Sequence, residues 1–415
     1  LFEGPRSTPE LSFAVRLVKA QAGINLTASH NPPEYNGYKV YFEDGCQVVE
    51  PHASSIIAKV NAVESEDYLA VPESERGKVI PMGVDIDEAY MARLSTLPLD
   101  PDLIRRENSL KIVYTPLHGV GGVIIKPMLK RLGFQCEGVA EQEVPDGRFP
   151  TVKSPNPENA EALSMAISQA DRTGADLVIA TDPDDDRMGI AARNAEGCMQ
   201  LITGNQIGSI LAWYRSMKFF EKGILNAGNH SRGVIIKTFV TTDLQKAIAD
   251  KFGLRCVETL TGFKYIGQKL GNYEAAIPAP LRQGYSDLPE EETRRLRLEH
   301  SSFYVFGGEE SYGYSASDFV RDKDGNSAAV LIAEAAAYAK SRGTTLAGLL
   351  DEIFAEFGVF LERGESLTMD GAEGAAQINK LVDSYSSNPP NEMDGSSVAS
   401  IQNFATDTIH DVEGD

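Results

Sequence analysis

The sequence is poor in positive charge, and it has no long apolar run. Its 39 lysine and arginine residues stand against 60 aspartate and glutamate residues, a formal net charge of −21 at pH 7. So acidic a surface repels nucleic acid and anionic membranes, which excludes both as partners. An anionic substrate therefore needs a site that gathers the few cationic side chains locally. No apolar run approaches the roughly 20 residues that span a bilayer, and no secretory signal is visible at the start.

Cysteine is also scarce. The four cysteines show neither the spacing of a metal site nor that of a disulfide framework, which is typical of structural thiols in a reducing cytoplasm. We therefore predict a cytoplasmic protein. The remaining composition, with 42% hydrophobic and 24% charged residues, is that of an ordinary soluble α/β protein, and 415 residues predict two to four domains. The cysteines are Cys46, Cys136, Cys198 and Cys256.

Strand-like runs alternate with helical patterns along most of the chain, which is typical of α/β domains. The run 177–180 is apolar throughout, as expected for a strand buried on both faces. Further strands are expected at 24–27, 111–115, 136–140, 188–192, 234–238, 254–258 and 303–306. Helices are expected at 10–22, from about 123, and at 158–172, 243–251, 326–341 and 345–357, with a charged and helical surface excursion within 275–300.

Three successive α/β units each end a strand in a polar loop. We therefore predict three related α/β domains with mixed sheets around a shared cleft. After about residue 362 the composition shifts to Gly, Ser, Asn and Asp, which predicts a linker or the start of a further, incomplete domain. The predicted boundaries are 1–105, 106–222, 223–362 and 363–415.

The stretch from Thr27 to Lys39 places a hydroxyl, an imidazole and a lysine in one loop. Proline at 32 and 33 prevents a helix or a central strand, and Asn36-Gly37 is a turn dipeptide. The chain therefore leaves a strand, presents Ser29 and doubles back toward Lys39. A serine with a base and a cation nearby can be modified covalently during turnover. The alternative is an ordinary turn or capping serine.

Asp182, Asp184 and Asp186 alternate at the end of an expected strand. Alternate side chains point the same way in an extended loop, and converging carboxylates favour a hard cation. An EF-hand calcium loop is excluded, because Arg187 and Arg193 stand where it needs Gly and Glu. A small, incomplete oxygen cage favours Mg²⁺ over the alternative of a solvated acidic turn. Arg187 would orient the carboxylates or meet a phosphate.

Three loops resemble signature segments of the α-D-phosphohexomutases, the family of phosphoglucomutases and phosphomannomutases. These are Thr27 to Lys39, Thr181 to Arg187 and Gly307 to Gly313. The resemblance runs through most of residues 1–360. Related segments of the family also match Thr115 to Gly122, Phe149-Pro150 and Thr261 to Lys264.

The resemblance implies an enzyme, a phosphosugar mutase that interconverts hexose 1-phosphate and hexose 6-phosphate through a hexose 1,6-bisphosphate. It implies that Ser29 is the phosphoserine and that one of its phosphate oxygens joins the three aspartates on Mg²⁺. Lys39 would be an acid or base, and Glu309 and Ser311 would hold sugar hydroxyls. These roles suit the chemistry, since phosphoryl transfer depends mostly on positioning and on neutralising charge.

Further candidates are less specific. His30 would shape the serine loop or act in the chemistry, and His118 would face the cleft or bind a backbone carbonyl. Thr261, Gly262 and Lys264 are substrate candidates through the family segment that they belong to. Lys237 and Arg321 are candidate phosphate or sugar contacts, with surface charge as the alternative for them and for Lys264.

Two family features are not found in the sequence. A phosphate-gripping loop of the Arg-x-Ser-Gly-Thr type does not precede Asp415, and the first domain opens without the usual strand, helix and arginine-bearing segment. We therefore expect a fragment of a longer mutase that lacks the start of domain 1 and most of domain 4, and that turns over poorly.

The resemblance also bears on the substrate. It implies glucose for Glu309-Glu310-Ser311, since related loops in phosphomannomutases often replace the second glutamate, while phosphomannomutase or phosphopentomutase activity is an alternative. A non-catalytic protein that binds metal or sugar phosphate is the alternative from another class. The oligomeric state stays open.

Overall fold

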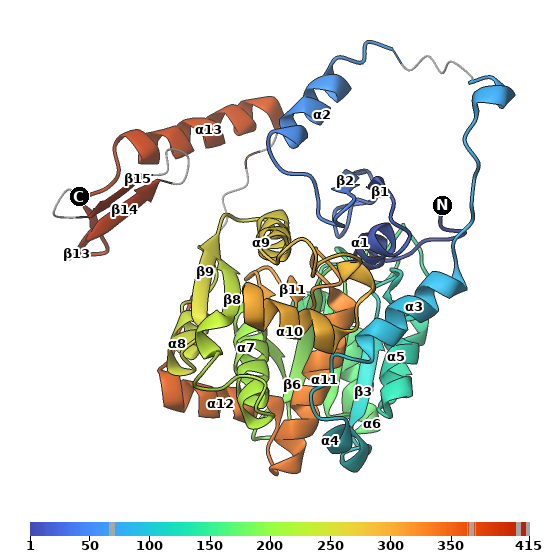
Figure 1. Cartoon of the computed structure of the whole chain (residues 1–415). Coiled ribbons are helices and arrows are strands. Elements are labelled where there is room, and N and C mark those ends of the chain that lie inside the picture. Colours follow the sequence, from blue (N-terminus) through green and yellow to red (C-terminus); the bar gives the residue numbers. More distant parts are fainter. Residues whose placement is uncertain (66–70, 363, 365–368, 370, 404–407, 412–415) are drawn as a thin grey trace. The chain divides into compact units, whose positions relative to one another are not determined.

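The computed structural model describes residues 1–65, 71–362, 364, 369, 371–403 and 408–411. The chain divides into two compact units, Leu1–Phe360 and Leu361–Asp415 (Figure 1). Among the helices of these described residues, none is long and apolar enough to cross a bilayer.

The described residues of the N-terminal part contain one short antiparallel pair of strands among four α-helices. β1 and β2 pair so that Asn25 lies opposite Lys39, and the loop between them carries Ser29. The first helix ends sooner than the predicted 10–22, because β1 already begins at Ala22. The elements are α1 (Thr8–Leu17), β1 (Ala22–Leu26), β2 (Tyr38–Phe42), α2 (His52–Asn61), α3 (Val84–Leu94) and α4 (Pro101–Arg106).

The second part contains a five-stranded mixed sheet in the order β4-β3-β5-β6-β7. β3 is parallel to β4 and β5, while β6 is antiparallel to β5 and β7. All five residues of β5 are buried, as the apolar run predicted. The elements are β3 (Lys111–Thr115), α5 (Ile125–Leu132), β4 (Gln135–Gly138), α6 (Ala160–Thr173), β5 (Leu177–Thr181), β6 (Met188–Arg193) and β7 (Met199–Ile202).

The third part contains a four-stranded mixed sheet in the order β11-β10-β8-β9. β8 is parallel to β9 and β10, and β11 closes the edge antiparallel to β10. The charged excursion within 275–300 contains the predicted helix, α10. The elements are α7 (Gly204–Glu221), β8 (Gly233–Thr238), α8 (Leu244–Lys251), β9 (Arg255–Thr259), α9 (Phe263–Ala275), α10 (Glu290–His300), β10 (Phe303–Gly308), β11 (Tyr314–Ser315), α11 (Gly325–Ser341) and α12 (Leu346–Phe357).

The two larger sheets share one hydrophobic core. Ile179 of the five-stranded sheet and Val305 of the four-stranded sheet belong to the same buried cluster as Leu331 of α11. α11 contacts β5 and β6 of the five-stranded sheet and also β11 and α7. It is buried along most of its length, which its seven alanines allow by permitting close approach. The shared core fixes the strand ends of both sheets relative to each other.

The second unit has regular structure of its own. Its described residues form one helix and two antiparallel strand pairs. The phosphate-binding role predicted for 363–415 stays a prediction, as do the predicted domain boundaries. The elements are α13 (Gly371–Ser387), β12 (Glu392–Met393), β13 (Ser396–Ser397), β14 (Ser400–Asn403) and β15 (Thr408–Asp411).

Candidate functional site

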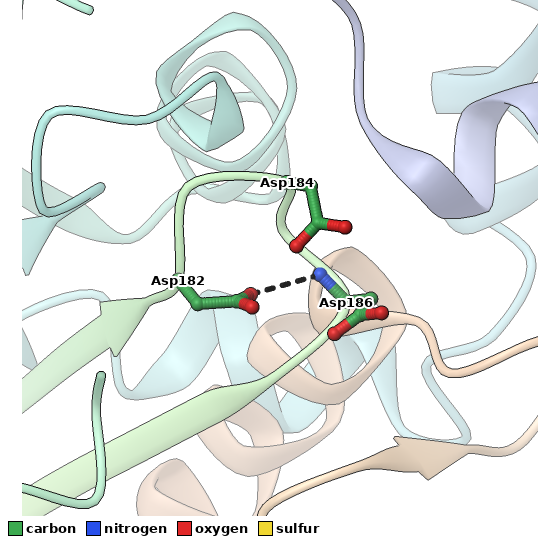
Figure 2. Close-up of side chains that lie close together, drawn as sticks. All are labelled: Asp182, Asp184 and Asp186. Carbon is green, nitrogen blue, oxygen red and sulfur yellow. Dashed lines mark hydrogen bonds between the residues drawn. The ribbon is translucent and has the colours of Figure 1, made fainter. Parts of the chain in front are cut away.

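Three buried carboxylates converge in the tight loop between β5 and β6. Asp182, Asp184 and Asp186 each place an oxygen within 4.8 Å of the others (Figure 2). Asp182 Oδ1 shapes the loop, because it accepts hydrogen bonds from the backbone N–H of Asp186 at 3.1 Å and of Arg187 at 3.0 Å. The predicted convergence of these three side chains is thus what the structure shows.

The carboxylates form an oxygen cage suited to a hard divalent cation. Burial, followed by the charges of Asp184 and Asp186, raises the pKa of Asp182 well above its usual range. One oxygen of Asp184 and one of Asp186, Oδ1 in each case, are buried without a hydrogen-bond partner. Like charges held this close disfavour ionisation unless a cation offsets them, so the residues fit a Mg²⁺ site.

Two lysine side chains form ion pairs with the same carboxylates. Lys39 Nζ lies 3.0 Å from Asp184 and 3.0 Å from Asp186, and Lys323 Nζ lies 3.1 Å from Asp186. Burial opposes the charge of Lys39, but the charges of Asp186 and Asp184 outweigh it and raise its pKa well above the ordinary value. Lys39 is therefore an ammonium at neutral pH, which is the form that donates a proton.

The serine loop reaches the acidic loop directly. Ser29 Oγ donates a hydrogen bond of 2.6 Å to Asp182 Oδ2, although 153 residues separate them in sequence. Ser29 has a φ of +52°, a backbone conformation that few non-glycine residues adopt and that often marks a functional position. Its N–H donates to Thr27 Oγ1 at 2.9 Å, which holds this bend.

His30 lies beside the same hydroxyl. Its Nδ1 is 3.1 Å from Ser29 Oγ. Burial and then the nearby charge of Arg187 lower the pKa of His30 to about 4. The imidazole is therefore neutral at physiological pH, and it can accept or donate one hydrogen bond at each ring nitrogen according to its tautomer.

A threonine that the sequence did not single out fixes the acidic loop from the side. Thr8 Oγ1 donates to Asp184 Oδ2 at 2.8 Å and accepts from Asn25 Nδ2 at 2.6 Å. Its backbone N–H also donates to the carbonyl of Asp184 at 2.9 Å. Thr8 opens α1, where hydroxyl residues are common as caps, so the sequence carried no signal of this second role.

The loop after β10 carries two further candidate residues, Glu309 and Ser311. Glu309 is 5% exposed, and its Oε1 accepts a hydrogen bond from the N–H of Gly262 at 2.9 Å. This contact joins two segments predicted to bind sugar. Burial raises the pKa of Glu309, and the nearby charge of Lys323 partly offsets the rise. Ser311 is half-buried in the same loop.

The β10–β11 loop and the acidic loop are connected through their backbones. Arg187 and Gly313 form an antiparallel bridge, and the N–H of Met188 donates to the carbonyl of Tyr312 at 3.0 Å. Arg187 Nη1 pairs with Glu158 Oε1 at 2.8 Å. The metal-binding candidates and Glu309 therefore belong to one connected set of loops.

Three further predicted residues lie in different surroundings. His118 Nε2 pairs with Thr151 Oγ1 at 2.7 Å, in a loop that packs behind the acidic loop. Lys264 is half-buried near the start of α9, and its ammonium lies 5.2 Å from the ring centre of Tyr265. Thr261 is exposed in the preceding loop.

Lys237 and Arg321, both predicted as phosphate or sugar contacts, lie in ion pairs with carboxylates of the protein. Lys237 is buried in ion pairs with Asp243 at 3.1 Å and Glu258 at 2.8 Å. Arg321 is fully buried and pairs with Glu274 and Asp318. The predicted contacts of these two residues with phosphate or sugar stay a prediction.

Comparison with known proteins gives consistent results. Family models of the phosphoglucomutase/phosphomannomutase α/β/α domains I, II and III match residues 1–67, 88–197, and 203–279 with 292–357. A phosphoglucomutase of Staphylococcus epidermidis is 34% identical over 418 residues, covering 99% of this chain and 69% of that protein. One from Staphylococcus aureus is 32% identical over 414 residues, covering 99% and 68%.

Solved structures show the same fold. A crystal structure from Thermus thermophilus, described as that of a phosphomannomutase, has a TM-score of 0.65 at 27% identity and covers 86% of this chain and 68% of that one. The open form of parafusin, a phosphoglucomutase from Paramecium, has a TM-score of 0.60 at 19% identity and covers 98% and 70%. The predicted class of three α/β domains with mixed sheets is confirmed.

Proposed function

Because the chain belongs to the phosphoglucomutase/phosphomannomutase family, we propose that it interconverts hexose 1-phosphate and hexose 6-phosphate with Ser29 as the phosphate carrier. One observation carries this proposal: Ser29 Oγ lies 2.6 Å from Asp182 in the acidic cluster. A phosphate on that oxygen would stand beside the cage that fits a divalent cation. A turn or capping serine has no need of such a neighbour.

The aspartates and lysines supply the electrostatics of the transfer. Asp182, Asp184 and Asp186 would hold Mg²⁺, which when bound offsets phosphate charge and polarises the transferring group. In the transfer, the bond between phosphorus and Ser29 Oγ breaks while a bond to a sugar oxygen forms. Lys39 gives a proton to the departing oxygen and regains one from the attacking hydroxyl over the cycle. Lys323 adds a second positive charge at the same place.

The sugar is held on the opposite side. Glu309 would accept hydrogen bonds from sugar hydroxyls, and Ser311 would donate or accept them. Thr261, Gly262 and Lys264 would add further contacts to the substrate. The hexose 1,6-bisphosphate formed after the first transfer reorients, so that its other phosphate returns to Ser29. The same bisphosphate would load the unphosphorylated enzyme. Arg187, which borders both loops, would meet a phosphate.

Glucose is the substrate that we favour, because the loop keeps a second glutamate that related loops in phosphomannomutases often replace. The second glutamate of the loop, Glu310, accepts from Thr238 Oγ1 at 3.3 Å and Thr241 Oγ1 at 3.2 Å. Two hydroxyl donors hold this carboxylate in place. Turnover of glucose 1-phosphate, mannose 1-phosphate and ribose 1-phosphate, measured in one coupled assay, decides among the hexose and pentose alternatives. The four free cysteines fit a protein that works in the reducing cytoplasm.

Intact mass spectrometry of the wild type and of Ser29→Ala tests the central claim. After incubation with glucose 1,6-bisphosphate, the wild type should gain the mass of one phosphate, and the variant should gain none. Ser55 in α2 lies outside the proposed site, so Ser55→Ala is the matched control and should gain the phosphate. A wild type that never carries the phosphate would leave the protein as a non-catalytic binder of metal or sugar phosphate.

A further inference from the structure

A cavity lies away from the acidic loop. It has a volume of about 250 Å³ and is bounded by the end of β2, the loop after it, α9 and the segment that follows α9. Its walls carry Asp44, Gly271, Glu274, Arg282 and Arg321. Among the residues predicted to bind metal, sugar or phosphate, Arg321 alone lines this cavity.

An unpartnered guanidinium nitrogen is buried at this cavity. Arg321 is fully buried, and its Nε donates to the carbonyl of Asp318 at 3.2 Å. Its Nη2 pairs with the carboxylates of Asp318, at 3.0 Å, and of Glu274. Its Nη1 has no hydrogen-bond partner within the described structure. A buried charged donor left without an acceptor is unfavourable, so an acceptor from outside the chain is expected there.

The ion-pair network behind the cavity is rich in arginine. Arg16 shares the carboxylate of Glu274 with Arg321, at 3.2 Å from its Nη2, and Arg297 pairs with Asp318 at 2.5 Å. Three guanidinium groups therefore share the carboxylates of Glu274 and Asp318, and the charge of Asp44 also acts on Arg321. Arg282 adds another positive group at the cavity wall, and no side-chain ion pair holds it among the described residues.

The opposite wall of the cavity carries a hydrogen-bond acceptor. Asp44 lies there, and its Oδ1 accepts from the N–H of Cys46 at 3.0 Å. Gly271 separates the two walls: a Cβ at this position would lie 3.5 Å from Arg321 Nη1 and 3.5 Å from Asp44 Oδ2. The absence of a side chain in α9 thus leaves open the space between a cationic and an anionic group.

We propose that this cavity binds a phosphate group, carried by inorganic phosphate or by a small hydroxylated phosphate ester. Arginine matches phosphate oxygens in charge and geometry, so Arg321 Nη1 and Arg282 would hold them. A ligand that also donates a hydrogen bond would meet the carboxylate of Asp44 on the opposite wall. A phosphate keeps a proton part of the time near neutral pH, and an ester adds hydroxyl donors. A carboxylate ligand has no such donor.

Gly271→Ala tests the site, because its methyl group fills the gap between Arg321 and Asp44. Isothermal titration calorimetry with inorganic phosphate should show one binding event in the wild type that weakens about tenfold or more in the variant. Arg282→Gln should weaken the same event without filling the cavity. Alanine favours the helix, so Gly271→Ala should melt no lower than the wild type, which excludes unfolding as the cause.

Two controls keep the result specific. Gly77→Ala adds a methyl group at an exposed position with no atom within 4 Å, and it should bind phosphate as the wild type does. Ser29→Ala should also keep this binding event. A failure of phosphate binding at the cavity can therefore be distinguished from a failure of the proposed mutase activity. Superimposable phosphate isotherms for the wild type, Gly271→Ala and Arg282→Gln would overturn the proposal.

The ligand is defined by comparison of three anions. Sulfate has no proton to donate at neutral pH, so it should bind this site more weakly than phosphate does. Sulfate that binds as tightly would contradict the role given to Asp44. Glucose 6-phosphate that binds more tightly than inorganic phosphate, with the difference lost in Gly271→Ala, would identify an ester as the ligand. The reverse order would identify free phosphate.

Discussion

Asp184 is the residue where three elements of the site meet. Its Oδ2 accepts from Thr8 and pairs with Lys39, while its Oδ1 is free. Asp184→Asn should therefore lower Mg²⁺ affinity tenfold or more, since the cage loses one of three charges. In the wild type, Mg²⁺ at one hundred times its Kd should stabilise the protein by about 2.7 kcal/mol. The melting temperature of the variant should respond far less to the same MgCl2 series.

Asp351→Asn is the matched control for that experiment. Asp351 lies exposed on α12, so the same chemical change there should leave the response to Mg²⁺ unaltered. If Asp184→Asn kept the wild-type response, the three carboxylates would not be the ligands.

Glu10 gives the site region a dependence on pH. It is fully buried, and burial together with the carboxylate of Asp87 raises its pKa from 4.5 to about 9. Between these values the native state keeps a proton that the unfolded chain has released. The free energy of unfolding should therefore fall as pH rises through this window, by roughly 1.4 kcal/mol for each pH unit.

Glu10→Gln removes this titration and keeps the shape of the side chain. Urea unfolding at pH 5, 7 and 8.5 should show the variant gaining stability relative to the wild type as pH rises. Glu161→Gln, at the exposed start of α6, should follow the wild type throughout. A constant difference between Glu10→Gln and the wild type would contradict a raised pKa.

At the residue scale, the sequence predicted the groups that share a motif. Ser29 and the three aspartates were found because the spacing itself implies the chemistry. Thr8 and Lys323 were missed, since each reaches the cluster from an unrelated part of the chain. The burial of Arg321 could not be foreseen either, because its partners become neighbours only in the folded protein.

At the scale of elements, the loop between β3 and α5 supports the acidic loop by close contact. A Cβ on Gly119 would lie 2.2 Å from the Cα of Pro183. Gly119→Ala should therefore displace the acidic loop, lower the free energy of unfolding by about 1–3 kcal/mol and weaken Mg²⁺ binding. Thermal denaturation with and without Mg²⁺ measures both effects.

Gly122→Ala in the same loop is the control. A Cβ there meets no atom within 4 Å, so neither stability nor Mg²⁺ binding should change. Equal effects of both substitutions would mean that the loss of glycine flexibility, rather than contact with Pro183, matters.

Predicted strands and helices agree with the structure where apolar periodicity is strong. β5, β8 and α6 match their predicted ranges within two residues. The end of α1 was misplaced by five residues, because the apolar pattern continues beyond Leu17 while the backbone turns at Lys19, which has a φ of +54°. Such a turn depends on local backbone geometry that apolar spacing does not record.

At the scale of the whole first unit, the sequence predicted three related α/β domains, and the two larger sheets share one hydrophobic core. α11 follows the four-stranded sheet in sequence and also covers β5 and β6 of the five-stranded sheet (Figure 1). No pattern in a helix that is apolar nearly all round shows which sheets it will touch. The sequence therefore predicted the three domains, and the structure shows how two of their sheets are held together.

Because the two larger sheets share one core, we expect them to lose stability together. Ile332 in α11 is completely buried in the cluster that both sheets supply. Ile332→Ala should lower the free energy of unfolding by about 2–5 kcal/mol. Because residues of α11, β5 and β8 belong to one core, hydrogen exchange of the variant should show the protection of backbone amides falling together in β5 and in β8. Loss of protection in only one of the two sheets would show that they unfold independently, and the placement of the acidic loop relative to the Glu309 loop would then need another cause.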